Sequence, residues 1–424
     1  MSVIINHSRL PTPDFLNMRK LSLSSTVAFA AIAQNPQLII LMAAGSLTTM
    51  TGAVFNPALG EIKHQLQLAP EIGGYLAAAH VWALGLFSLP LGILSDRVGR
   101  VKVLIVSLLC YAVFGTAGVT VDDFLPLIAL RGCLGIATAG ITSASLGLLT
   151  SMYEGEERAK ALGYATGTLT LAGIVFPLLG GGVGYFFHWR YIFCLYAIGL
   201  PLAVLTAKIL PQPAERTSVK TQQERPKHKL WQVLGRYQTI WLLLTLSLTS
   251  IVMYSVVFYT PQYFKDTINA NTLTNSLVLA SRALGAAIIS AFGARKLSQS
   301  LGLYKATAVG FILMALTLST IPFLREISLI MLAAVGFGAG FGLILPNLYD
   351  ALASLAPSQL RSSVLSAGAG AGFIGQSFCP IVLGFVVKHH GIEAAFFTAA
   401  SASIVVGMLL LLFGSREQGA GSRE

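Results

Sequence analysis

Long apolar runs alternate with short polar segments from about residue 38 to about residue 413. A helix that crosses the hydrocarbon core of a bilayer needs about 20 mostly apolar residues. Reading the chain with this window predicts twelve spans, in two sets of six. The spans are expected near 38–58, 73–94, 101–120, 125–150, 160–186, 190–210, 238–262, 272–293, 304–323, 327–349, 363–387 and 392–413. The pattern therefore predicts an all-α integral membrane protein built from two six-helix bundles.

The polar segments between these runs divide the chain into five parts. We expect a cytoplasmic N-terminal arm over 1–36, a first bundle over 37–210, a linker over 211–237, a second bundle over 238–414 and a tail over 415–424. No cleavable signal peptide is expected, because the first strong apolar run begins only near residue 37.

Composition supports the membrane assignment. Hydrophobic residues make up 54% of the 424 residues and charged residues 11%, with a mean hydropathy of +0.73. Soluble domains carry about 25% charged residues, so a soluble enzyme of this size could not cover its surface. The four cysteines lie within apolar runs, without the spacing of a zinc site or a disulfide framework. We therefore expect no metal and no cofactor.

The net charge of +11 comes mostly from one side of the membrane. If the N-terminus is cytoplasmic, the inner segments hold 21 Lys and Arg residues and the outer loops hold 5. Lys and Arg collect in cytoplasmic loops of membrane proteins. This predicts a bacterial inner-membrane protein with both termini in the cytoplasm, and it removes the need for a nucleic-acid partner. Segment 208–236 alone has seven basic residues, which would favour anionic lipids of the inner leaflet or simply keep a tether solvated.

A repeat relates the two halves at a constant offset of 203 residues. The matches fall on loop glycines, loop cations and a mid-helix proline, where composition alone does not favour identity. Two sets of six spans have the same orientation, so the repeat is parallel, about an axis along the membrane normal. The matched pairs include Gly99 with Gly302, Gly135 with Gly338, Arg158 with Arg361, Pro177 with Pro380, and Gly181 with Gly384.

The loop between the second and third spans, Gly92–Arg100, places one acid and two arginines at the inner mouth of the first bundle. Its glycines allow a tight turn, and its acid can pair with a cation or with a helix N-terminus as the halves move. A plain positive-inside anchor is the alternative. The candidate gating residues are Gly92, Asp96, Arg97, Gly99, Arg100, Arg158 and Arg361.

The loop Gly92–Arg100 resembles motif A of the major facilitator superfamily. Residues 131–135 resemble motif B of that family, and residues 173–181 resemble motif C, which is described for its drug/proton antiporters. The resemblance covers essentially the whole chain and implies the major facilitator fold, alternating access and a part for Arg131 in proton coupling. The sequence departs from these motifs at Phe176, where motif C has glycine, and at Gln299 and Ser300 in the second-half copy of motif A.

Ionisable residues within spans are costly and therefore functional candidates. Arg131 lies too deep in the fourth span to reach water, so we expect it to face a central cavity, in proton coupling or in a structural ion pair. His80 in the second span titrates near neutral pH in water, and is either a proton carrier or a packed histidine. Asp350, at the inner end of the tenth span, is expected to take part in coupling or to form a local ion pair.

Candidate substrate contacts follow from the usual make-up of ligand sites, which are mostly aromatic and apolar with a few polar groups. Any single aromatic residue in a membrane helix can equally be packing. The absence of a carboxylate stripe or an arginine cluster favours a lipophilic, even cationic, substrate over an anion or a sugar. The candidates are Phe55, Asn56, Tyr254, Phe258, Tyr259, Arg282, Phe373 and Gln376.

The sequence thus predicts a monomeric transporter that exchanges protons for a small lipophilic or drug-like compound. A proton symporter or uniporter that imports a small metabolite is the alternative. An intramembrane enzyme or a sensor would need a catalytic pair or a metal site within the spans, and the sequence offers neither.

Overall fold

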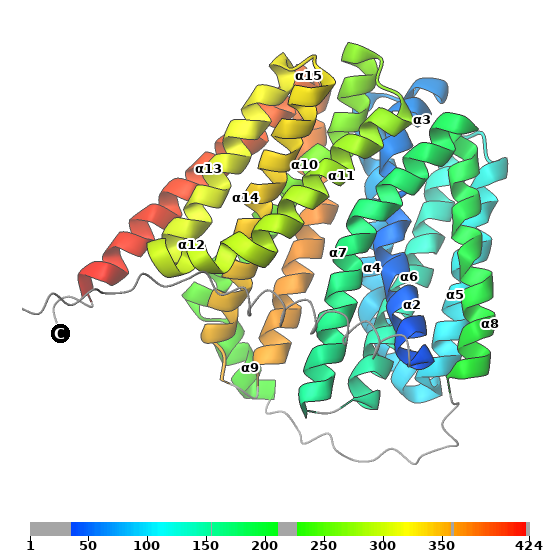
Figure 1. The fold of residues 1–424 in the computed structure, drawn as a ribbon, viewed down its shortest axis with the longest axis horizontal. Helices are drawn as coiled ribbons and strands as arrows, with labels where there is room; N and C mark the ends of the chain where they lie inside the picture. The colour runs from blue at the N-terminus through cyan, green and yellow to red at the C-terminus, as the bar shows by residue number, and fades with distance from the viewer. Residues whose placement is uncertain (1–34, 154, 211–226, 358–359, 421–424) are drawn as a thin grey trace, which may run out of the picture.

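A computed structural model describes residues 35–153, 155–210, 227–357 and 360–420, and these residues form helices joined by short turns, with no strand. Figure 1 shows the helices of the first half on the right and those of the second half on the left. The first half contains α2 (Pro36–Ala53), η1 (Asn56–Ala58), α3 (Leu59–Gln65), α4 (Pro70–Val98), α5 (Arg100–Thr116), η2 (Ala117–Thr120), α6 (Phe124–Met152), α7 (Gly155–Phe186), η3 (Trp189–Ile198) and α8 (Gly199–Ile209). The second half contains α9 (Lys227–Leu234), α10 (Tyr237–Ile268), α11 (Thr272–Ile288), the π-helical turn η4 (Ile289–Gly293), α12 (Ala294–Leu301), α13 (Leu303–Thr320), η5 (Ile321–Phe323), α14 (Ile327–Ser354) and α15 (Arg361–Ala420).

Eleven helices in the described residues are long and apolar enough to cross a bilayer. The last of them runs over Val364–Leu412, and its 49 residues exceed twice the length that one crossing requires. Gly391 interrupts it with φ 82° and ψ 172°, and Figure 1 shows the chain turning back between the orange and red parts of α15. The predicted spans 363–387 and 392–413 are therefore these two arms. The all-α membrane fold predicted from the sequence is confirmed.

The two halves repeat the same close helix crossing. A Cβ atom on Gly135 of α6 would lie 2.2 Å from the carbonyl oxygen of His80 in α4, and one on Gly338 of α14 would lie 1.9 Å from that of Arg282 in α11. Only glycine permits helix backbones to approach so closely. Gly99 and Gly302, also 203 residues apart, both have positive φ, at 108° and 82°. The internal repeat is therefore present in the backbone geometry as well as in the sequence.

Part of the predicted linker 211–237 is helical. Helix α9 occupies Lys227–Leu234, with Trp231 exposed and Val233 buried, so one face of this short helix packs against the second half. Residues 1–34 and 211–226, which the sequence analysis assigned to the arm and the rest of the linker, lie outside the described residues.

Candidate functional site

A cavity of about 440 Å³ lies between the two halves. Helices α2, α4, α6 and α7 line it from the first half, and α10, α11 and α15 line it from the second. Its volume falls in the usual range for small-molecule sites. Six residues singled out from the sequence are brought together there: Asn56, His80, Tyr254, Arg282, Phe373 and Gln376.

The halves are pressed together at one end, here called the closed end. There α3 packs on α10, and a Cβ atom on Gly60 would lie only 2.3 Å from the carbonyl oxygen of Pro261. Lys63 forms an ion pair with Asp266, and Lys265 forms another with Glu61 at 2.8 Å. Both pairs join residues of opposite halves.

These two ion pairs were not anticipated from the sequence, which assigned Lys63 and Lys265 only to outer loops. One signal was present, since positions 63 and 266 are related by the offset of 203 residues. Repeat-related positions lie at the same depth on opposite sides of the pseudo-twofold axis, so a basic residue and an acidic residue there can meet across it.

The cavity opens away from the closed end. Leu146, Leu169 and Phe373 line it and are nevertheless 52%, 40% and 37% exposed. Leu146 lies near the C-terminal end of α6, on the same side of the molecule as Arg100 at the start of α5. The structure therefore has one closed mouth and one open mouth.

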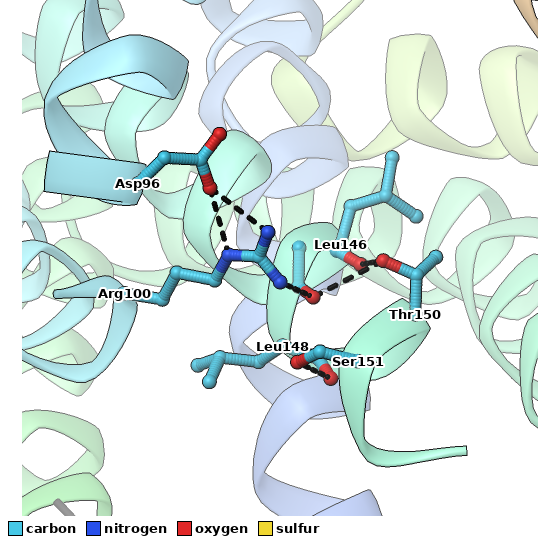
Figure 2. Close-up of polar contacts among 7 residues, drawn as sticks. Asp96, Arg100, Leu146, Leu148, Thr150 and Ser151 are labelled. Carbon is cyan, nitrogen blue, oxygen red and sulfur yellow. Dashed lines mark hydrogen bonds and ion pairs between the residues drawn. The ribbon is translucent and has the colours of Figure 1, made fainter. Parts of the chain in front are cut away.

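The prediction of a loop over Gly92–Arg100 is wrong for most of this segment: α4 continues to Val98, and only Gly99 separates it from α5. The segment is fastened to its own half (Figure 2). Asp96 Oδ1 accepts hydrogen bonds from Arg100 Nε at 3.0 Å and Nη2 at 2.8 Å, and Arg100 Nη1 donates to the carbonyl oxygen of Gly147 in α6. A cation at the last turns of a helix complements its dipole. Gly99 supplies the left-handed turn that α5 needs to begin at Arg100. Of the other predicted gating residues, Gly92 is half-buried in α4 and faces Ser143 of α6, whereas Arg97 is exposed on α4. The side chains of Arg158 and Arg361 lie outside the described part.

Arg131 lies inside the first bundle and is only 1% exposed. Its Nη1 donates to the carbonyl oxygen of Thr51 at 2.8 Å, and its Nη2 donates to that of Ala77 at 3.2 Å and to His80 Nδ1 at 2.8 Å. The guanidinium carbon lies 4.0 Å from the ring centre of Phe55, a favourable cation–π contact. Arg131 thus ties α2, α4 and α6 together.

The expectation that Arg131 faces the cavity is corrected by this arrangement. Helix α2 breaks near Pro57, and the Phe55 amide bonds to Gly52, which leaves the Thr51 carbonyl free for Arg131 and for Tyr196, whose hydroxyl donates at 2.9 Å. A buried carbonyl without a partner is costly, so the guanidinium turns to it instead of the cavity. His80 connects Arg131 with the cavity, because it contacts Arg131 and also lines the cavity.

Three predicted substrate contacts prove to be packing residues. Phe55, Phe258 and Tyr259 are each at most 1% exposed, and none lines the cavity. The ring of Phe258 packs against that of Tyr254 at a tilt of 45°, with ring centres 5.2 Å apart. Asp350 is exposed near the end of α14 and does not line the cavity either. Helix rotation decides which aromatic residue of a uniformly apolar helix faces the ligand, and this rotation is not written in the sequence pattern.

The charge of the cavity also differs from the expectation. Among the described residues that line it are Arg282 and His80 but no Asp or Glu. The sequence-based preference for a cationic substrate is therefore not supported by the cavity, because a cation there would meet an arginine and no counter-charge.

We expect reversal of one cross-half ion pair to loosen the closed end. Lys63→Asp places two carboxylates together, and their repulsion destabilises the closed end. If the free-energy difference between the closed and open states changes by about 1 kcal/mol, the ratio of their populations changes about fivefold. Double electron–electron resonance between spin labels at positions 64 and 326, in a cysteine-free background, should show a longer distance across this end. The double reversal Lys63→Asp with Asp266→Lys should restore it.

The control reverses the charge at Arg190, which forms an ion pair with Asp122 within the first half. Arg190→Asp should leave the distance across the closed end unchanged. An unchanged distance in Lys63→Asp would show that the pair does not hold the halves together.

Comparisons with known proteins agree with this architecture. The family model of the Major Facilitator Superfamily matches residues 41–378 and 264–424. The multidrug efflux protein YfmO of Bacillus subtilis is 26% identical over 366 residues, which are 85% of this chain and 88% of that protein. The cis,cis-muconate transport protein of Acinetobacter baylyi is 22% identical over 372 residues, covering 85% of this chain and 89% of that protein.

Solved structures share the fold. A D-xylose–proton symporter superposes with a TM-score of 0.72 at 16% identity, over 88% of this chain and 96% of that one. A bacterial homologue of the human lysosomal transporter Spinster, in an inward-facing and unoccupied conformation, superposes with a TM-score of 0.71 at 16% identity. The superposition covers 89% of this chain and 94% of that one. With its two helical bundles and the family model matched over most of its length, the chain belongs to the Major Facilitator Superfamily and is a membrane transporter.

Proposed function

We propose that this transporter exports a small lipophilic compound in exchange for protons, by alternating access. The observation that carries the proposal is the cavity lined by both halves, which is sealed at one end by contacts between them and open at the other. The excess of basic residues in the inner segments predicted from the sequence supports a cytoplasmic position for the open end. The structure then corresponds to the inward-facing state, which receives substrate from inside the cell.

The substrate binds among Asn56, Tyr254, Arg282, Phe373 and Gln376, which come from both halves. A ligand can drive the change of state only if it binds the two states with different affinity. Because the wall is shared, rocking of one half against the other changes the distances from the ligand to half of its contacts. The similarity to the multidrug efflux protein YfmO supports export of a drug-like compound.

His80 carries the coupled proton in this proposal. Arginine only donates, so the 2.8 Å contact with Arg131 requires that His80 Nδ1 is the acceptor. A proton on Nδ1 replaces this acceptor with a donor and places two cations side by side. Protonation would therefore break the link between α4 and α6 next to the substrate cavity, and this gives proton binding a mechanical consequence.

The experiment is substrate-dependent proton movement in proteoliposomes, screened over dyes, antibiotics and small metabolites. His80→Gln keeps a polar side chain but cannot take up a proton, so we expect coupled proton movement to fall at least about tenfold while substrate binding is retained. His64→Gln is the matched control, because His64 is exposed on α3 and does not line the cavity. Proton movement at the wild-type ratio in His80→Gln would exclude His80 as the carrier.

Proton-coupled import of a small metabolite is the second candidate. The similarity to the cis,cis-muconate transport protein favours it, since that relative covers as much of the chain as YfmO does. Loss of an exporter raises sensitivity to a toxic compound, whereas loss of an importer prevents growth on one nutrient. A deletion strain tested in both ways separates the two directions.

A further inference from the structure

The cavity holds a cation, Arg282, that forms no ion pair with an acidic residue in the described part of the chain. Arg282 of α11 lines the cavity, and its one hydrogen bond among the described residues runs from Nη1 to Met253 Sδ at 2.8 Å. A thioether is a weak acceptor. The Nε atom of Arg282 is buried and has no partner in the described part of the chain. A charge within a membrane protein is normally paired, so this arginine lacks the group that it is suited to bind.

The free side of the guanidinium has a specific shape. With Nη1 occupied by Met253, the Nε and Nη2 hydrogens remain as two parallel donors on one edge. This edge matches the two oxygens of a carboxylate in a bidentate pair, and such charge-assisted pairs are among the strongest hydrogen bonds in proteins. A neutral hydroxyl or amide offers the two donors a single, uncharged acceptor oxygen, so it matches this edge less well than a carboxylate does.

The other polar groups of the cavity are consistent with an acceptor ligand. Because His80 Nδ1 accepts from Arg131, the ring hydrogen of neutral His80 is on Nε2, which lies beside Gly52 of the cavity wall. Tyr254 and Gln376 contribute a hydroxyl and an amide, which can also donate. With no acidic residue among the described lining residues, the site offers donors from both halves and a positive charge from Arg282 of the second half.

The rest of the wall is apolar. Leu41, Leu84, Leu169 and Phe373 surround the polar groups, and the cavity of about 440 Å³ is large enough for an aromatic or branched body in addition to a carboxylate. A small inorganic anion would leave this apolar surface uncovered.

We propose that the cavity binds an amphipathic organic acid, with its carboxylate on Arg282 of one half and its apolar body against the leucines and Phe373. This substrate class rests on the proposed transport function, which leaves the charge of the lipophilic compound open. The position of Arg282 in α11 makes the second half the carboxylate-binding half, while His80 of α4 contacts the ligand from the first.

The test uses full-length protein in lipid nanodiscs and three probes with the same body: phenylbutyrate, phenylbutyramide and phenylbutylamine. Isothermal titration calorimetry near neutral pH should give binding of the acid, with the amide weaker by about 10- to 100-fold and the amine not bound. Arg282→Gln should remove the preference for the acid. Arg282→Lys keeps the charge but not the two parallel donors, so it should keep part of that preference.

Arg295→Gln is the matched control, because Arg295 is exposed on α12 and does not line the cavity. It should bind phenylbutyrate as the wild type does. Absence of phenylbutyrate binding, equal or tighter binding of the amine, or an unchanged acid preference in Arg282→Gln would overturn the inference. So would chloride or phosphate that competes with phenylbutyrate at equal affinity, because the site would then be one for inorganic anions.

Transport assays separate this inference from the function on which it rests. If phenylbutyrate binds through Arg282 but no panel compound moves protons in proteoliposomes, the acid site stands and proton-coupled transport fails. If a neutral or cationic lipophile is exchanged for protons equally well by wild type and Arg282→Gln, the transport proposal stands and the acid site fails.

Discussion

Replacing Arg131 with alanine is expected to lower the free energy of unfolding by roughly 3 kcal/mol or more. The substitution removes the side-chain donor of the Ala77 carbonyl oxygen and one of the two side-chain donors of the Thr51 carbonyl oxygen, which keeps the Tyr196 hydroxyl. It also frees His80 Nδ1 and opens a void beside Phe55. Three helices lose their common partner at once. Denaturant titration in mixed micelles measures the change, and the midpoint of thermal unfolding should fall by several degrees.

Two further variants show whether the loss of stability comes from the contacts of Arg131. Arg131→Lys keeps the charge, but a compact ammonium cannot contact the separate acceptors on α2 and α4 together, so its stability should lie between those of wild type and alanine variant. Arg295→Ala removes an exposed arginine and should change stability by no more than about 0.5 kcal/mol. If Arg131→Ala were as stable as this control, the network would not hold the bundle together.

Replacing Gly60 with leucine is expected to prevent the closed end from closing. A Cβ atom at this position would lie 2.3 Å from the Pro261 carbonyl oxygen and 2.9 Å from Lys265 Cβ, so α3 must move away from α10. Overpacking of this kind costs about 1–3 kcal/mol, which shifts the balance of states by about one to two powers of ten. The protein should then favour the opposite state, with the cavity closed at the end that is open here.

Labelling of a cavity cysteine measures this shift. In a cysteine-free background, Leu146→Cys provides a thiol on the open wall of the cavity, and its rate of reaction with a polar maleimide in micelles should fall about tenfold when Gly60→Leu is added. Gly85→Leu is the control, because nothing lies within 4 Å of a Cβ atom there. An unchanged labelling rate with Gly60→Leu would mean that the contact of Gly60 with Pro261 does not select the state.

The sequence indicated some residues of the cavity but not the contacts that they make. Asn56, His80 and Arg282 were recognised because a polar residue in an apolar span is conspicuous, and the structure places all three on the cavity. Their partners were not recognised. Whether His80 meets Arg131 depends on the rotation of α4 against α6, which the close approach at Gly135 sets.

Aromatic residues were the weakest part of the prediction. Tyr254 and Phe258 lie one helical turn apart, yet Tyr254 lines the cavity and Phe258 packs behind it. In a soluble protein the polar face of a helix would reveal which side is buried. Lipid and protein interior are both apolar, so a membrane helix that is hydrophobic all round carries no such mark.

The sequence by itself determined the spans, the two matched halves and the turn at Gly99, because each depends on local properties: the length of an apolar run, a spacing along the chain, or a backbone conformation that only glycine adopts easily. The tertiary structure alone decided that Arg131 serves the bundle interior, that Lys63 meets Asp266 across the halves, and that Arg282 faces a cavity without acids. These outcomes depend on helix rotation and on contacts between residues from 51 to 203 positions apart, which the one-dimensional pattern does not contain.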